Sequence, residues 1–247
     1  MEDKEKTLVC QKSGKTGKYG YVDAQGKEVI PFIYARARDF EDGYAMVRDE
    51  ESQYCKFIDE SGKIVYTLEC KKAEIITQGK VIFLKNRKWG MVDITNGKMI
   101  LPCEYTSINS HEGNEIEIYG KRENRILKIE KGKKWGLVDL DGKIVLPLEY
   151  GCISVYIGEK IVAEVEKDEK WGVIDIINKK IILPLEYDAI HVYDYIQSSN
   201  RKKNVYCLLV VKNEKCGLID LNGDIILPLE YDGILNVQKM VKNFSLR

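Results

Sequence analysis

Two histidines, His111 and His191, are the first places to look for acid–base chemistry in this chain. A catalytic histidine works beside a nucleophile and an orienting acid, and neither histidine lies in a segment with that pattern. The nucleophile-elbow, phosphate-loop, dinucleotide-binding and zinc-protease motifs are absent from the sequence. We therefore expect a protein that is not an enzyme, with no catalytic, metal-binding or cofactor-binding residues and no cofactor.

Seven cysteines could supply a metal site or disulfides. Their number is odd, and none has the Cys-x-x-Cys spacing that is typical of zinc sites. Several stand where a repeated pattern has an apolar residue, such as Cys103 for leucine and Cys216 for tryptophan. We expect small buried side chains in a reducing compartment. Because the amino terminus is charged and lacks a signal-peptide core, we expect a cytoplasmic protein.

Carboxylates are numerous enough to include a glycosidase-like pair, but the most regular ones belong to a repeat. The dipeptide Trp-Gly occurs at Trp89, Trp135 and Trp171, which are all the tryptophans of the chain. Tyr19, Cys55 and Cys216 hold the same place in three weaker copies, each followed four residues later by an aspartate. Successive copies are 34 to 46 residues apart, and spacings of this size indicate repeat architecture. The recurring carboxylates are therefore best explained by a structural role in each repeat.

All five prolines fall in a second recurring element, Pro-x-x-Tyr, which follows a hairpin signal such as Asn96-Gly97 or Asp141-Gly142. The second copy lacks this element, and in the fifth copy Asn178-Lys179 replaces the hairpin glycine, with Asn expected to take the left-handed conformation. The copies of the element are Ile30–Tyr34, Leu101–Tyr105, Leu146–Tyr150, Leu183–Tyr187 and Leu227–Tyr231.

Each repeat reads as an antiparallel meander of three strands, with room for a short fourth such as 190–193. Alternation places Ile144, Leu146, Leu148 and Tyr150 on one face of the last strand. Proline cannot donate to a sheet ladder, which predicts an edge strand. We expect the tryptophan ring to fill space between repeats, the following glycine to allow close approach, and the aspartate to accept hydrogen bonds from turn amides.

This combination of Trp-Gly, aspartate, turn glycine and Pro-x-x-Tyr resembles the WG-repeat family of bacterial proteins over nearly the whole chain. The resemblance implies tandem β-rich units and no particular activity. We predict an all-β single domain over residues 1–247, made of six antiparallel β-meander repeats in an open superhelical array. The repeats align at residues 19, 55, 89, 135, 171 and 216, and the second is degenerate. A six-bladed β-propeller is the alternative, because blades of four short strands fit the period.

Charge and hydropathy exclude two classes of partner. Lys plus Arg and Asp plus Glu both total 39, so the basic excess that is typical of nucleic-acid binders is absent and no nucleic-acid partner is expected. No stretch approaches the ~18 apolar residues of a membrane-spanning helix. We therefore expect no membrane span.

Two long segments, 109–125 and 193–204, interrupt the regular pattern in the third and fifth repeats. Function in repeat proteins tends to lie where repeats differ, and both segments mix aromatic and polar residues as recognition loops do. Tolerated lengthening of a loop is the structural alternative. The candidate partner-binding residues are His111, Tyr119, Arg122, Tyr193, Tyr195, Gln197 and Arg201.

The functional prediction is a non-enzymatic module that binds a protein or peptide partner on its β surface. The first alternative is a glycan or cell-envelope binding module, which requires solvent-facing rings such as Tyr105, Tyr150, Tyr187 and Tyr231. The second alternative is an enzyme with its site in one of the long segments or at the centre of a ring.

Overall fold

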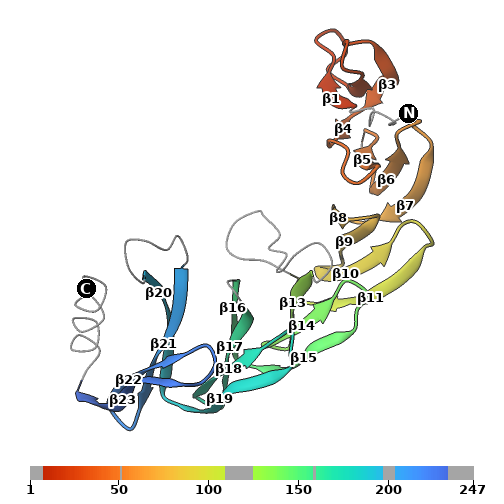
Figure 1. Ribbon diagram of the computed structural model, residues 1–247. Coiled ribbons are helices and arrows are strands. Elements are labelled where there is room, and N and C mark those ends of the chain that lie inside the picture. The colour runs from red at the N-terminus through yellow and green to blue at the C-terminus, as the bar shows by residue number, and fades with distance from the viewer. Residues whose placement is uncertain (1–7, 51, 109–124, 158–159, 197–203, 233–247) are drawn as a thin grey trace. The chain divides into compact units, whose positions relative to one another are not determined.

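The computed structural model describes residues 8–50, 52–108, 125–157, 160–196 and 204–232. The regular structure of these residues is β only, in one three-stranded and five four-stranded antiparallel sheets (Figure 1). Each sheet consists of strands that are consecutive in the sequence, so every repeat is a meander. The predicted all-β fold of tandem antiparallel meanders is confirmed, and the choice between an open array and a closed ring stays a prediction.

The contacts divide the chain into two compact bodies, and we describe each separately. The first comprises the described residues within Met1–Glu117, Lys128–Lys131 and Leu140–Lys143, and the second those within Ile118–Leu127, Gly132–Asp139 and Ile144–Arg247. That residues 1–247 form a single domain stays a prediction.

The first three sheets contain β1 (Val9–Lys12), β2 (Tyr19–Val22) and β3 (Glu28–Tyr34); β4 (Arg36–Ala37), β5 (Tyr44–Arg48), β6 (Tyr54–Asp59) and β7 (Ile64–Glu69); and β8 (Lys72–Thr77), β9 (Lys80–Lys85), β10 (Lys88–Asp93) and β11 (Lys98–Tyr105). The last three contain β12 (Ser107–Ile108), β13 (Ile126–Lys131), β14 (Lys134–Asp139) and β15 (Ile144–Tyr150); β16 (Cys152–Ile157), β17 (Ile161–Lys167), β18 (Lys170–Asp175) and β19 (Lys180–Tyr187); and β20 (Ala189–Ile196), β21 (Asn204–Lys212), β22 (Lys215–Asp220) and β23 (Ile225–Asp232).

The proline strand is the edge of its sheet in all five repeats that have one, as predicted. Trp171 pairs with Tyr187 and Val173 with Leu183, so that Gly172 alone faces a bulge of three residues around the proline. A Cβ on Gly172 would lie 2.8 Å from the carbonyl oxygen of Leu183. The glycine and the proline therefore occur together because the bulge brings two backbones too close for a side chain. The same crowding is present at Gly20, Gly90, Gly136 and Gly217.

A second irregularity corrects the predicted alternation of the proline strand. Leu137 pairs with Leu146, but Val138 pairs with Ile144, which leaves Val145 as an extra residue. A single inserted residue reverses which face the following side chains occupy. Leu146 is buried whereas Ile144 is 64% exposed, so the prediction that they lie on one face of the strand is wrong.

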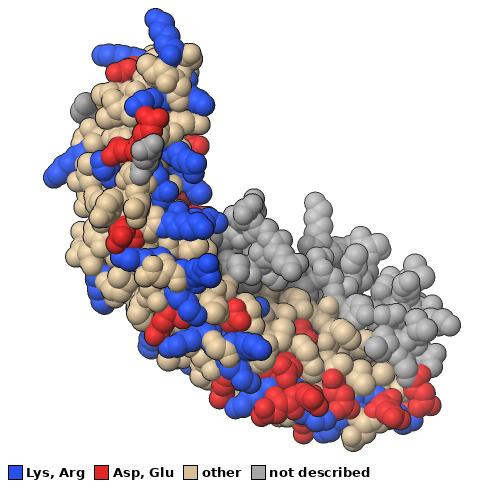
Figure 2. Space-filling model, turned by 180° about the vertical axis from the view of Figure 1, so that it is seen from behind, with Lys and Arg blue, Asp and Glu red and all other residues tan. Residues whose placement is uncertain are grey.

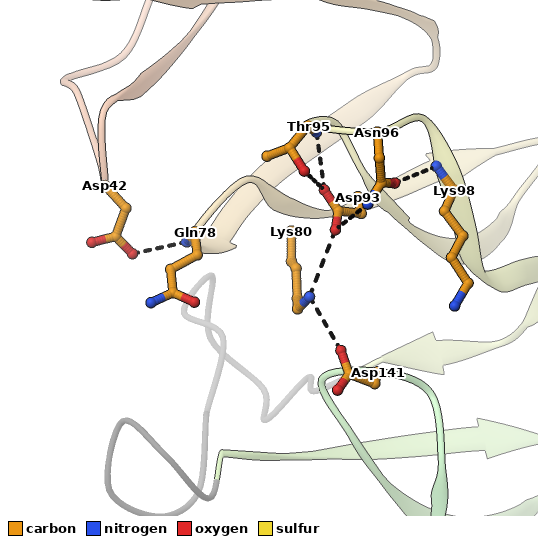
Figure 3. Close-up of polar contacts among 8 residues, drawn as sticks. All are labelled: Asp42, Gln78, Lys80, Asp93, Thr95, Asn96, Lys98 and Asp141. Atoms are coloured by element: carbon orange, nitrogen blue, oxygen red, sulfur yellow. Dashed lines mark hydrogen bonds and ion pairs between the residues drawn. The ribbon is translucent and has the colours of Figure 1, made fainter.

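The repeated aspartate has the predicted role in the hairpin turn. Asp93 accepts hydrogen bonds from the amide of Thr95 (2.9 Å) and the side-chain amide of Asn96 (3.1 Å), and Lys80 Nζ lies 3.8 Å from its carboxylate (Figure 3). Lys80 also reaches Asp141, 3.3 Å away, in the next hairpin (Figure 3). The aspartate accepts hydrogen bonds of this kind in the first, second, third, fifth and sixth repeats, where they fix the turn that leads into the last strand.

The fifth repeat differs from the prediction at its hairpin. Lys179, at the position of the usual turn glycine, has a φ of 53°. Asn178, which was expected to adopt this conformation, instead donates from its backbone and side-chain amides to Asp175. Asparagine is thus used here for its hydrogen bonds, and the lysine carries the left-handed strain.

The hydrophobic core is divided into clusters that lie between successive repeats. In the first body one cluster joins Cys55 and Phe57 of the second sheet to Val81 and Phe83 of the third. In the second body Tyr150 packs with residues of β17, and Tyr187 with residues of β21. Within each body, these sheets therefore bury apolar side chains against the next sheet in sequence.

The tryptophan rings lie at the margins of these clusters. Trp135 and Trp171 pack against buried clusters, but both rings, like that of Trp89, are only half-buried. The predicted location of the ring beside an inter-repeat cluster is thus correct for Trp135 and Trp171, but the rings are less buried than predicted.

Candidate functional site

The first body contains a groove of about 650 Å³ where the second and third sheets meet. It is bordered by the end of β7, the start of β8 and the turn between β9 and β10. Four of its lining residues are cationic and one is anionic. The lining therefore has a net positive charge. The lining residues are Arg48, Ser52, Gln53, Glu69, Cys70, Lys71, Leu84, Lys85, Asn86 and Arg87.

Two thiols lie at the wall of this groove. The Sγ of Cys70 donates a hydrogen bond to the Sγ of Cys55 over 2.9 Å. The guanidinium of Arg48 donates to Cys55 Sγ at 2.7 Å, and also to the carbonyl oxygens of Cys70 (3.0 Å) and Lys71 (3.2 Å). The two carbonyls hold the guanidinium in place, so its contact with sulfur is fixed by the backbone.

The surroundings of the pair separate the two thiols in acidity. The pKa of Cys55 is lowered, first by the hydrogen bond from the Cys70 thiol and then by Arg48, which outweigh burial. The pKa of Cys70 is raised by that same hydrogen bond and by burial. The surroundings therefore favour a thiolate on Cys55, beside the guanidinium, over one on Cys70.

The position of these cysteines in the repeat explains their contact. Cys55 stands at the tryptophan position and Cys70 eight residues after the hairpin glycine, which is the position of the repeated tyrosine. The second repeat has Lys56 and Thr67 where the others have glycine and proline, and β6 and β7 pair there without the proline bulge. The large Trp–Tyr pair of a regular repeat is thus replaced by two small side chains on a continuous ladder.

A second surface feature recurs along the chain. The first or second residue of the last strand of a repeat is a large exposed aliphatic residue in five of the six repeats. The exposed fractions are 46% for Ile64, 48% for Met99, 64% for Ile144, 62% for Ile181 and 66% for Ile225. We call these residues the edge-strand aliphatics. They lie on the outward side that the second bulge creates, so their exposure follows from the repeat itself.

The sequence matches one family, described as "WG containing repeat", at residues 19–51, 57–89, 89–113, 135–171, 171–198 and 217–239. The chain belongs to the WG-repeat family. The degenerate second repeat, with its two thiols, is thus a departure within an otherwise regular set of WG repeats. A comparison with curated proteins finds no match.

Solved structures share only a distant likeness with these WG repeats. Hsv2 from Kluyveromyces lactis is 7% identical over 92% of this chain and 76% of its own, with a TM-score of 0.37. AztD from Citrobacter koseri is 10% identical over 86% and 66%, with a TM-score of 0.35. A putative dipeptidyl aminopeptidase IV from Bacteroides ovatus is 14% identical over 82% and 37%, with a TM-score of 0.34. Similarity at this level carries no conclusion about activity.

Most candidate residues named from the sequence lie outside the described residues: His111, Tyr119, Arg122, Gln197 and Arg201. Tyr193 and Tyr195 lie in β20, with backbone partners Cys207 and Val205. The segment predicted as an insertion from residue 193 therefore begins as strand and continues the β20–β21 hairpin. These seven residues stay predictions as partner contacts.

The two long segments also belong to other repeats than predicted. The short strand after each proline strand pairs forward, as β12 does with β13 and β20 with β21. The described strands on either side of each segment therefore pair within the fourth and sixth sheets, so the assignment of the segments to the third and fifth repeats is wrong; residues 109–124 and 197–203 themselves lie outside the described residues. Sequence order alone could not decide whether a short strand pairs backward or forward.

The glycan alternative loses its main support in the structure. It requires a solvent-facing ladder of the repeated tyrosines, but Tyr105, Tyr150 and Tyr187 are only 8%, 6% and 8% exposed. Burial raises the pKa of each of these phenols. These three buried rings are not available to stack on a sugar, and the fourth, Tyr231, is half-buried.

One buried carboxyl in the second body bears on the enzyme alternative. Glu164 is buried, accepts a 3.0 Å hydrogen bond from the Tyr156 hydroxyl, and has a raised pKa because burial outweighs that bond and the nearby His191. Among the described residues no group of three or more His, Cys, Asp or Glu side chains could hold a metal. Glu164 and the buried Asp175, whose pKa is lowered by hydrogen bonds from Asn178, are the two buried carboxyls among the described residues of this body, and whether the protein is an enzyme stays a prediction.

Charge on the surface is mixed. The face shown in Figure 2 has Lys and Arg interspersed with Asp and Glu among its described residues. Within the described part of the chain, no helix is long and apolar enough to cross a membrane.

Proposed function

We propose that this WG-repeat protein is a non-enzymatic binding module that presents its edge-strand aliphatics to a protein or peptide partner. The supporting observation is the exposed aliphatic residue that recurs at one repeat position in five of six repeats. Exposed large apolar side chains are unfavourable in water and, when they recur in a regular arrangement, are typical of interaction surfaces.

The chemistry of the edge narrows the mode of binding. Each proline strand is an edge strand, and its proline lacks the amide hydrogen that an added strand would need. Strand addition along this edge is therefore disfavoured. We infer that the partner contacts the side chains of the edge-strand aliphatics and not the backbone of the edge strand. Its own apolar groups would be spaced to meet those of successive repeats.

The seven free cysteines fit a reducing compartment, and we propose the cytoplasm as the place where the module works. The long segments at 109–125 and 193–204 remain proposed secondary contacts. Their residues adjoin the first hairpin of a repeat, whereas the edge-strand aliphatics lie on the last strand.

The test compares capture of partners from native extract by wild type and by a triple variant, Ile144→Ser, Ile181→Ser and Ile225→Ser. The matched control is Ile177→Ser, which removes an exposed isoleucine outside the repeated position. We expect the triple variant to lose the specific partner by at least tenfold and the control to retain it. Equal capture by all three folded proteins would exclude the edge-strand aliphatics as the binding surface.

A deletion of residues 194–203 tests the long segment separately. If the deletion variant no longer captures the partner and the triple isoleucine variant still does, the binding site is assigned to the long segment instead of the edge-strand aliphatics.

A further inference from the structure

The degenerate second repeat brings together a feature that the binding function does not use. Its two cysteines are in direct sulfur–sulfur contact, an arginine touches one of them, and a groove opens onto the other. We propose that Cys55 and Cys70 form a redox-active dithiol, which small hydroperoxides oxidise to a reversible disulfide. This inference does not depend on the identity of any binding partner.

The first argument is distance. The sulfurs of Cys55, in β6, and Cys70, which directly follows β7, are 2.9 Å apart, and a disulfide bond is about 2.05 Å long. Bond formation thus needs a shift of less than ~1 Å, which side-chain rotation can supply without separating the strands.

The second argument is the state of the sulfur. The nucleophile toward a peroxide is the thiolate. Arg48 stabilises a negative charge on Cys55, because its guanidinium is held by the carbonyls of Cys70 and Lys71 and points at the sulfur. Cys70 donates a hydrogen bond to Cys55, so once Cys55 is a thiolate, proton transfer along this bond makes either sulfur able to attack.

The third argument is access. Cys70 lies on the wall of the 650 Å³ groove, and Cys55 is directly behind it. Hydrogen peroxide is hardly larger than water and can enter such a hollow. A bulky alkylating reagent should react more slowly, since both cysteines are buried.

The reaction is balanced with the peroxide as oxidant. One thiolate attacks a peroxide oxygen, an S–O bond forms, the O–O bond breaks and hydroxide leaves. The second sulfur attacks the resulting sulfenic sulfur, the S–S bond forms, the S–O bond breaks, and the hydroxyl leaves with the shared proton as water. Two electrons pass from the two sulfurs to the peroxide, and an external dithiol reverses the change.

The chain contains two buried control cysteines, Cys207 and Cys216. Cys216 also stands at a tryptophan position, but the two lie four positions apart in the β21–β22 register, since Cys207 pairs with Asp220 and Cys216 with Val211. Burial alone raises the pKa of Cys207. A general sensitivity of buried thiols would oxidise all four cysteines alike. The proposal predicts selectivity for Cys55 and Cys70.

The experiment uses the full chain, reduced, freed of reductant and exposed to hydrogen peroxide, with mass spectrometry of peptides after alkylation. We expect a cross-linked Cys55–Cys70 peptide, two hydrogens lighter than its parts, which forms at least tenfold faster than Cys207 or Cys216 loses its thiol and disappears on adding dithiothreitol. Oxidation of all four cysteines at one rate, or no cross-link in the folded protein, would overturn the proposal.

Two variants test the role of the arginine. Arg48→Met should slow the cross-link by about tenfold or more, because the thiolate loses its cation. Lys85→Met removes another groove cation that pairs with Glu69 and contacts neither sulfur, so it should leave the rate within about twofold. Equal slowing in both variants would mean that only the general positive field matters, which contradicts the assigned contact.

A third variant, Cys70→Ser, removes the second sulfur. Peroxide should then leave Cys55 as a sulfenic acid that dimedone labels. If this variant does not fold, the wild-type cross-link and the Arg48 and Lys85 variants still decide the question.

Discussion

The second and fifth repeats of this protein show what the WG signature is for. The fifth repeat has Trp171, Gly172 and Tyr187, and its proline strand bulges so closely that a Cβ on the glycine would meet backbone. The second repeat has Cys55 and Lys56 at the first two of these places, and its strands pair there in continuous register. Both repeats keep the capping aspartate, the turn and the edge position.

The difference teaches that the signature consists of two separable groups. Aspartate and the turn define the hairpin and survive in the degenerate repeat. Glycine, proline and tyrosine accompany the bulge and are lost together in the second repeat. Tryptophan is not tied to the bulge, because the first and sixth repeats keep the bulge with Tyr19 and Cys216 at the tryptophan position. Once the bulge is gone, two small residues can occupy the Trp–Tyr place, and this created room for the contact between Cys55 and Cys70.

The largest expected effect comes from adding one methyl group at the bulge. Gly172→Ala places a Cβ 2.8 Å from a backbone carbonyl oxygen and 3.1 Å from the amide nitrogen of Leu185. Backbone cannot move aside as a flexible side chain can, so we expect a loss of about 3 kcal/mol in the free energy of unfolding. Urea denaturation followed by circular dichroism measures it.

The equivalent change in the second repeat is the control. Lys56→Ala alters the same repeat position without a bulge opposite it, and removes only a side-chain pair with Asp49. It should cost less than about 1 kcal/mol. Similar losses for the two variants would show that the glycine is not required by the bulge.

Much of this fold follows from the sequence, because its determinants are local. Hairpin glycines, aspartate caps and the proline edge depend on residues a few positions apart, and each was predictable. The reversed face of Ile144 was not, because one bulged residue shifts the alternation without any signal in the sequence. The thiol contact was missed for a different reason: Cys55 and Cys70 lie 15 residues apart and were interpreted separately as small apolar residues.

Replacing a tryptophan tests the other half of the signature. Trp135→Ala should lower the free energy of unfolding by about 2 kcal/mol, less than the 3–5 kcal/mol of a fully buried ring, because this ring is half-buried at the edge of its cluster. Cys216→Ala, at the same place in the sixth repeat, should cost about 1 kcal/mol because it removes a single sulfur. A loss near 5 kcal/mol for Trp135→Ala would mean that the ring is a central core residue.

The fifth repeat also departs from the pattern, at its hairpin. Lys179 has a φ of 53°, whereas the degenerate second repeat has the usual glycine, Gly62, at this position. Lys179→Gly should raise the free energy of unfolding by about 0.5–1 kcal/mol, because the left-handed conformation costs a side chain more than it costs glycine. Lys180→Gly, one residue on in β19, should be destabilising. A loss of stability in both variants would contradict the strain assigned to Lys179.

The smallest expected effect concerns ion pairs between repeats. The glutamate before the repeated tyrosine meets a lysine of the next repeat at four junctions: Lys85 with Glu69, Lys131 with Glu104, Lys167 with Glu149 and Lys212 with Glu186. At the junction between the first and second repeats, Ile33 takes the place of the glutamate.

These pairs are a third to a half exposed, so each is screened by solvent. A double-mutant cycle on Lys167→Met and Glu149→Gln should give a small coupling free energy that vanishes in 1 M salt. A large coupling that persists in salt would show that the pair determines the register of stacking. In that case the first junction, without its glutamate, would be the weakest place in the array, and proteolysis should begin there.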